Sequence, residues 1–171
     1  MWWFATALLS TLLAASCGYH VAGRGSRLPA AWKTIAVPAL ENHTSRYRIE
    51  QRLTEALVRE LLARTSYRVV PDPGAADAVL RGEVLAVEAV PALFDAATGR
   101  ATTMQITVRL RVSLADRPSG KSVFRNDNFV FREQYEISTD VASFFEEQEP
   151  ALGRLARDFA ATLVSALLET F

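Results

Sequence analysis

The alternation of hydrophobic and polar positions along this chain predicts its secondary structure. From Met104 to Leu114 every even-numbered side chain is apolar, whereas the odd-numbered ones include Arg109 and Arg111. A strict period of two is typical of a strand with one buried face and one polar face. Between Ile49 and Leu61 leucine or isoleucine recurs every fourth residue, which predicts an amphipathic helix of about four turns packed on a core.

Four more apolar runs are bounded by turn residues, and each predicts a further strand. These strands are expected at Lys33–Val37, Tyr67–Val70, Ala78–Val90 and Lys121–Ile137. The run Pro91–Arg100 is predicted to be a hairpin loop, and Asp116–Gly120 a tight turn. Gly82 indicates a bulge or a close approach of another chain segment, and Asn126–Asn128 indicates a bulge or bend in the last strand.

Leucines and a phenylalanine from Leu152 to Leu167 keep one helical face, so a second helix is expected near the C-terminus. Pro150 fits best in its first turn. Alternatively, an earlier turn through Phe144 and Phe145 precedes a kink at Pro150. For the first helix, capping side chains are expected from the loop Glu41–Arg46, namely Asn42, Thr44 or Ser45.

The order of elements is therefore strand, helix, four strands, helix. It predicts an α+β fold, a two-layer sandwich with two amphipathic helices packed on one face of a mixed, mostly antiparallel sheet of four to five strands. The first two strands form a right-handed crossover if they are parallel, and the later strands are expected to form an antiparallel meander.

The N-terminus predicts a leader that ends at a lipidated cysteine. Residues 1–16 are uncharged and almost wholly apolar, and they end in small residues directly before Cys17. This stretch has the length of a signal-peptide apolar region and is shorter than a membrane span. It lacks the usual basic residue, and Ala14 stands where leucine is usual, so a buried N-terminal helix is the alternative. We expect a signal peptide at 1–16, a lipidated tether at 17–32 and one domain at 33–171.

Composition excludes several functions. The formal net charge is zero, so no chain-wide basic field for nucleic acid exists. One cysteine and two histidines are too few for a typical structural zinc site. The sequence contains no phosphate loop, G-x-S-x-G or H-E-x-x-H motif. We expect neither an enzyme nor a cofactor other than the lipid on Cys17.

Cationic side chains are the candidate ligand-binding groups. Arg109 and Arg111 are two residues apart on one strand, so they project from its polar face, while Arg100, Arg117 and Lys121 lie at or near hairpin ends. Guanidinium groups bind phosphates bidentately, so these cations could hold a phosphorylated lipid head group. The alternative is an ordinary solvated strand surface.

Several segments resemble the lipopolysaccharide-assembly lipoproteins of the LptE family. They include the start of the mature chain, Cys17–His20, the first strand Lys33–Val37, the segment Arg81–Val84 and the run Phe131–Tyr135. The order of elements fits this family over nearly all of the mature chain.

This resemblance implies a non-enzymatic outer-membrane lipoprotein, held on the periplasmic side by the lipid on Cys17. Such proteins sit inside the LptD β-barrel, plug it, and are thought to bind lipopolysaccharide during its transport to the outer leaflet. Gly18 after the cysteine is similar to sorting signals for the outer membrane. The first half also resembles periplasmic lipoproteins that regulate peptidoglycan synthases and CsgG-type secretion subunits. The long strands up to Tyr135, followed by one terminal helix, favour the LptE interpretation.

Overall fold

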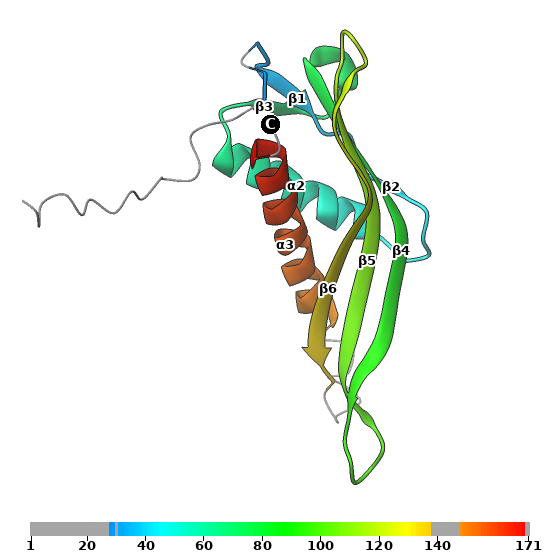
Figure 1. Cartoon of the computed structure of the whole chain (residues 1–171). Helices are drawn as coiled ribbons and strands as arrows, with labels where there is room; N and C mark the ends of the chain where they lie inside the picture. The colour runs from blue at the N-terminus through cyan, green and yellow to red at the C-terminus, as the bar shows by residue number, and fades with distance from the viewer. Residues whose placement is uncertain (1–27, 30, 138–147, 170–171) are drawn as a thin grey trace, which may run out of the picture.

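In the computed structural model, residues 28–29, 31–137 and 148–169 are described, and they form a sheet with two helices on one of its faces (Figure 1). The elements in chain order are β1 (Thr34–Ala36), β2 (Glu41–Asn42), α2 (Ile49–Arg64), β3 (Arg68–Val70), a short 3-10 helix (Pro73–Ala75), β4 (Ala78–Phe94), β5 (Ala101–Asp116), β6 (Ser122–Glu136) and α3 (Gln148–Glu169).

The sheet has the strand order β3-β1-β4-β5-β6, and β2 pairs with β4 outside this path. Strand β1 is parallel to both β3 and β4, whereas β4, β5 and β6 form an antiparallel meander. The predicted α+β sandwich with a mixed sheet is confirmed. The sheet has one strand more than expected, because Glu41–Asn42 pairs with Glu83–Val84 as a strand too short to have a periodic signal.

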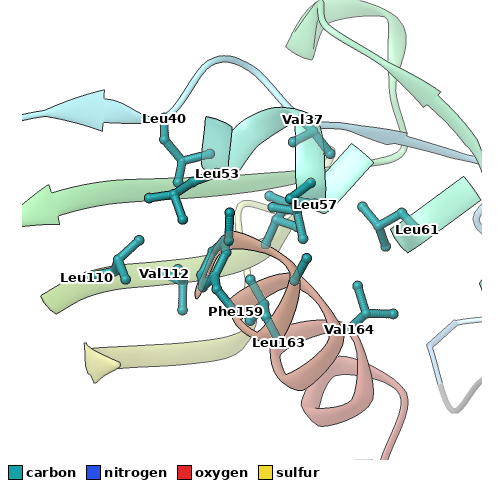
Figure 2. Packing of buried hydrophobic residues seen from close by; sticks show 14 of the residues in the cluster. Val37, Leu40, Leu53, Leu57, Leu61, Leu110, Val112, Phe159, Leu163 and Val164 are labelled. Atoms are coloured by element: carbon teal, nitrogen blue, oxygen red, sulfur yellow. The ribbon is translucent and has the colours of Figure 1, made fainter. Parts of the chain in front are cut away.

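The core lies between the helices and the sheet, as Figure 2 shows. The even-numbered side chains of β5 from Ile106 to Leu114 are at most 1% exposed, and so are Ile49, Leu53, Leu57 and Leu61 of α2. From α3, Phe159 packs edge-to-face on Phe131, with ring centroids 5.5 Å apart. The periodic positions of the sequence thus meet in one cluster. Leu28 and Trp32, which lie in the predicted tether, also join this core.

The two irregular positions expected in the strands are present. A Cβ on Gly82 would lie 3.0 Å from Leu40 Cγ, so glycine permits this close approach. In the β5–β6 pairing, Leu110 is opposite Phe129 but Val112 is opposite Asn126, which leaves an extra residue on β6 at this point. This is the bulge predicted from Asn126–Asn128.

The predicted start of the β4–β5 loop was wrong, because β4 continues through Pro91 to Phe94. Within the described residues, β1 and β2 pair with β4 only as far as Val84. Beyond Val84 no described strand lies beside this edge of β4, so a proline without an N–H group is tolerated there.

The predicted caps of α2 were also wrong. Arg48 occupies the cap position with φ 57°, and no side chain caps the first turn. Asn42 instead orders the preceding loop: its Nδ2 donates to Arg46 O at 2.9 Å and to Glu50 Oε2 at 2.8 Å. Within the described residues α3 begins at Gln148, which puts Pro150 in its first turn, as predicted. The alternative turn through Phe144 and Phe145 falls outside the described residues.

Candidate functional site

The five candidate cations lie in three separate places rather than in one cluster. Arg109 and Arg111 are in the middle of β5, Arg100 directly precedes this strand, and Arg117 and Lys121 flank the turn at its other end. A strand of 16 residues is roughly 50 Å long. A single head group cannot therefore contact all five side chains.

The sheet face opposite the helices, here called the bare face, carries mostly charged and polar side chains. Opposite residues of an antiparallel pair share a face, so the β5 register defines its members. They include Arg81, Glu83, Glu88, Arg109, Arg111, Arg125 and Arg132, and the bulge residue Asp127 joins them through its ion pair with Arg111. As predicted, Arg109 and Arg111 project from the non-core face.

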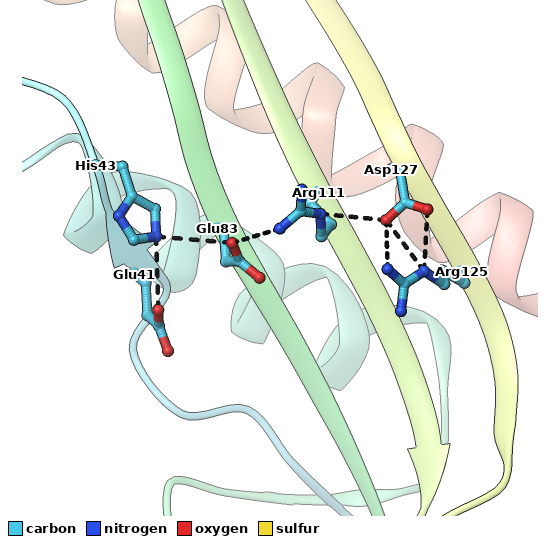
Figure 3. Close-up of polar contacts among 6 residues, drawn as sticks. All are labelled: Glu41, His43, Glu83, Arg111, Arg125 and Asp127. Atoms are coloured by element: carbon cyan, nitrogen blue, oxygen red, sulfur yellow. Dashed lines mark hydrogen bonds and ion pairs between the residues drawn. The ribbon is translucent and has the colours of Figure 1, made fainter.

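A row of alternating charges crosses the bare face from β4 to β6 (Figure 3). Arg111 Nη1 donates to Glu83 Oε2 at 2.9 Å, and Arg111 Nε lies 3.2 Å from Asp127 Oδ1. Arg125 Nε donates to both carboxylate oxygens of Asp127 at 3.0 Å. These hydrogen bonds, and then the charge of Arg125, hold the pKa of Asp127 below its ordinary value. Arg111 is therefore committed to two carboxylates.

The row continues to the strand at the sheet edge. His43 Nε2 lies 3.6 Å from Glu83 Oε2 and 3.6 Å from Glu41 Oε2. The row, from Glu41 through His43 to Arg125, therefore ties β2, β4, β5 and β6 together on the bare face.

Arg109 is held much more loosely than Arg111. Its nearest carboxylate is that of Glu88, at 3.9 Å, and 48% of its side chain is exposed. A pair at this distance and exposure contributes little to stability. Arg109 is thus the bare-face candidate whose guanidinium is available to a ligand or partner.

The end of the β4–β5 hairpin, residues 90–100, is here called the distal hairpin. It extends beyond α3 in Figure 1, and Val90, Leu93 and Phe94 expose 48%, 59% and 61% of their surface. Asp95 closes its loop by accepting hydrogen bonds from the Thr98 hydroxyl and N–H at 2.7 Å, which lower the pKa of Asp95. Arg100 ends this loop and is exposed. The distal hairpin is thus apolar with an adjacent cation.

Arg117 has a structural role at the opposite end of β5. Its Nε donates to the Ala76 carbonyl at 2.5 Å, and its backbone N–H donates to the Asp77 carbonyl at 2.8 Å. The Asp77 carboxylate accepts the N–H groups of Lys33 and Thr34 at 2.8 and 2.9 Å, and both lower the pKa of Asp77. Arg117 therefore fastens the β5–β6 turn to the residues that precede β4, and Asp77 joins those residues to β1.

Asp116 strengthens the same junction by accepting from the Trp32 indole at 3.0 Å. Lys121 is exposed, and no ion pair of its ammonium group is found among the described residues. Both cations at this turn are exposed, and Arg117 differs in that its Nε donates to the Ala76 carbonyl.

Sequence reasoning missed the carboxylates that pair with Arg111 and the apolar side chains of the distal hairpin. Glu83 and Asp127 have no distinctive spacing, and their role follows only from strand register. The exposed apolar side chains Val90, Leu93 and Phe94 could have been predicted as part of a longer strand, because apolar residues continue past Pro91 without a turn motif.

The part of the chain that the structure describes contains no cluster of three or more potential metal ligands. Within that part, no helix has the length and apolar character needed to cross a membrane. The predicted leader at 1–16 and the lipid attachment at Cys17 lie outside the described residues, and both stay predictions.

Comparison with known proteins points to one family. The model of the family LptE, described as lipopolysaccharide-assembly, matches residues 32–167. No functionally curated protein matches the chain.

Solved structures show where else this fold occurs. The solution structure of an uncharacterized lipoprotein B from Nitrosomonas europaea is similar, with a TM-score of 0.59, 13% identity, and coverage of 90% of this chain and 92% of that one. Rare lipoprotein B from Shewanella oneidensis has a TM-score of 0.53 and 16% identity, covering 79% and 95%. A dodecameric PelC from Paraburkholderia phytofirmans has a TM-score of 0.50 and 17% identity, covering 80% and 86%. At such identities the likeness shows the fold alone.

Proposed function

The chain belongs to the LptE lipopolysaccharide-assembly family, and we propose that it is a lipoprotein anchored through Cys17 on the periplasmic side of the outer membrane. There it assembles with an LptD-type β-barrel, plugs the barrel, and assists the transport of lipopolysaccharide into the outer leaflet. The role is that of a binding and assembly protein, without catalysis and without a cofactor other than the covalent lipid.

The bare face is the observation that carries the plug hypothesis. The interior of a large membrane barrel is polar and filled with water. The bare face presents charged side chains of both signs across β4, β5 and β6. The opposite face is covered by α2 and α3, so the sheet is backed by a packed core. A rigid body with a polar surface suits the inside of such a barrel.

The distal hairpin supports contact with lipopolysaccharide. An amphiphile with acyl chains and phosphates needs an apolar surface beside a cation. Leu93 and Phe94 supply exposed apolar area, and Arg100 supplies the charge at the end of the same loop. We assign Arg100, Arg109 and Lys121 to ligand or barrel contact, whereas Arg111 and Arg117 hold neighbouring parts of the fold in place.

The decisive experiment is a mild-detergent pull-down of the C-terminally tagged chain from its own outer membranes, with mass spectrometry of the co-purifying proteins. Equimolar recovery of a large LptD-type barrel is expected. Recovery of a cell-wall synthase, or of a ring of identical chains, would contradict the proposal and favour the regulator or secretion alternatives.

Point variants locate the contact surface in the same assay. Arg109→Glu reverses a loosely held charge on the bare face and is expected to reduce barrel recovery, whereas Arg68→Glu makes the same change on the edge strand β3. For the distal hairpin, Phe94→Ser is expected to weaken lipopolysaccharide binding. The matched control is Leu62→Ser on α2, because Leu62 is 56% exposed. Equal effects in test and control variants would show that neither surface is a contact.

The anchor is tested separately. Labelled palmitate is expected to enter the wild-type chain and not a Cys17→Ala variant, which should leave the membrane fraction. Labelling that persists in this variant would place the acyl group elsewhere and contradict the proposed lipid site.

A further inference from the structure

The polar faces of α2 and α3 bring arginines together from distant parts of the chain. Arg48, Arg52 and Arg59 recur on one side of α2 at helical spacing, and Arg157 belongs to α3. The helices lie side by side and run in the same sense. At their first turns Arg52 pairs with Glu149, and at the other end Arg64 Nη1 donates to Ser165 Oγ at 2.7 Å.

A cleft of about 520 Å³ lies between these faces. Its lining includes all four arginines, with Glu55 and Glu149 as its only carboxylates among the described residues. On the α3 side the cleft is lined by Gly153 and Ala156, whose small or absent side chains leave space for a ligand. This volume falls within the range of small-ligand sites, roughly 300 to 1,000 Å³.

The positive charge of this arginine cleft is only partly neutralised. Glu149 is shared by Arg52 and by Arg46, whose Nη2 lies 3.3 Å from Glu149 Oε1. Across the described residues, no carboxylate lies within ion-pair distance of Arg48, Arg59 or Arg157. Among the residues that the structure describes, three guanidinium groups around one cleft therefore have no carboxylate partner.

Arg48 lines the cleft and has an unfavourable backbone conformation. Its φ of 57° is the only positive φ of a non-glycine residue in the described ranges. Its guanidinium lies 4.9 Å from the centre of the Tyr47 ring, and Tyr47 is 77% exposed. Left-handed backbone is unfavourable for a residue with a Cβ, and such strain clusters at ligand-binding sites.

We propose that the arginine cleft binds the phosphate group of a small phosphorylated ligand. Guanidinium groups match phosphate oxygens bidentately, and arginine is the usual side chain for this recognition. A concave cleft of this volume admits a head group rather than a duplex. The site is on the helix layer, apart from the bare face and the distal hairpin, so it goes beyond the proposed function and does not depend on it. The phosphate could belong to a lipid head group or to a free solute.

The test uses the full chain in mild detergent, with two probes titrated separately by calorimetry. One probe is inorganic pyrophosphate, and the other is lipid A dispersed in the same micelles, with dephosphorylated lipid A as its control. We expect the double variant Arg59→Gln/Arg157→Gln to bind at least one phosphorylated probe roughly tenfold to 100-fold more weakly. Arg68→Gln on β3 is the matched control and should bind normally.

A gain of affinity is also expected. Glu55 is the carboxylate of the cleft that no arginine pairs with among the described residues. Glu55→Gln should therefore tighten binding of the phosphorylated probe about two- to fivefold. Unchanged melting temperatures of all variants would show that these effects are not due to unfolding.

The outcomes separate the source of the phosphate from the existence of the site. Binding of pyrophosphate that competes with lipid A identifies a lipid head group, whereas binding of pyrophosphate alone identifies a free solute. If neither probe binds, or if the double variant binds both as the wild type does, the proposal is overturned. Barrel recovery in the pull-down is a separate readout, so failure of one proposal leaves the other standing.

Discussion

The two faces of β5 have different roles, because one face packs in the core and the other presents charged side chains on the surface. On the core face, the even-numbered side chains from Ile106 to Leu114 are at most 1% exposed and pack under α2 and α3. On the bare face, Arg109 and Arg111 expose 48% and 41% of their side chains and contact carboxylates of β4 and β6. Residues next to each other in β5 thus alternate between a buried apolar core and a solvated charged surface.

The difference teaches where substitutions should matter. Burying an apolar side chain contributes about 1.5–3 kcal/mol, whereas exposed ion pairs contribute about 0–1 kcal/mol. Changes on the core face should therefore unfold the protein, and changes on the bare face should mainly alter what it binds.

Truncation at the centre of the core should give the largest loss. Phe159 is fully buried and packs edge-to-face on Phe129 and Phe131. We expect Phe159→Ala to lower the free energy of unfolding by about 3–5 kcal/mol, measured by urea denaturation. Phe94→Ala, on the exposed distal hairpin, should change it by less than about 0.5 kcal/mol. Similar losses in both variants would contradict the division between core and surface.

Filling the close approach at Gly82 should cost less. Its added Cβ would lie 3.0 Å from Leu40 Cγ and 3.5 Å from Val112 Cγ1, on the core face of the sheet. We expect Gly82→Ala to lower the free energy of unfolding by about 1–3 kcal/mol, and Leu40→Ala in the same chain to relieve the clash. Gly153→Ala is the control, because its nearest neighbour would be 3.7 Å away. If the losses of Gly82→Ala and Leu40→Ala simply add in the double variant, the clash with Leu40 does not explain the cost of Gly82→Ala.

Charge reversal on the bare face should have a smaller effect on stability. Arg111→Glu would place a third carboxylate beside Glu83 and Asp127. We expect a loss of about 1 kcal/mol that decreases with added salt. Glu83→Arg in the same chain should restore part of it. Arg109→Glu should cost less than Arg111→Glu, and the reverse order in thermal melting would mean that the row of charges does not stabilise the sheet.

The smallest expected effect is a dependence on pH at the β1–β4 junction. The N–H groups of Lys33 and Thr34 lower the pKa of Asp77 below 3.8 in the folded state. A lowered folded pKa means that this stabilisation is complete above the unfolded pKa and is lost as pH falls through the folded value. Melting temperatures should therefore fall more between about pH 5 and about pH 2 in the wild type than in Asp77→Asn. Equal slopes would show that Asp77 contributes nothing to acid sensitivity.

Local patterns predicted much of the fold, and their failures have physical reasons. The alternation in β5, the bulge at Asn126–Asn128 and the close approach at Gly82 were all expected. Pro91 was taken to end β4, but an unpaired edge tolerates proline. The α2 cap was assigned to the preceding loop, whereas Asn42 uses its side chain to order that loop.

The candidate site was less predictable than the fold. That Arg109 and Arg111 share the polar face follows from alternation alone. Their different availability does not, because it depends on Glu83 and Asp127 lying opposite Arg111 in the sheet register. Arg117 was a candidate ligand-binding residue by its place at a turn, and the sequence did not indicate that its Nε donates to the Ala76 carbonyl.

The sequence by itself determined which side chains face the core, because neighbouring side chains alternate on a strand and recur every three or four residues on a helix. It thereby determined the helices and the longer strands, the two-layer architecture and the polarity of each face. Only the tertiary structure decided which charges meet. Strand register places Glu83 and Asp127 beside Arg111, and the packing of α2 on α3 places Arg157 beside Arg48 and Arg59. Such contacts join residues far apart in the chain, and no local period specifies them.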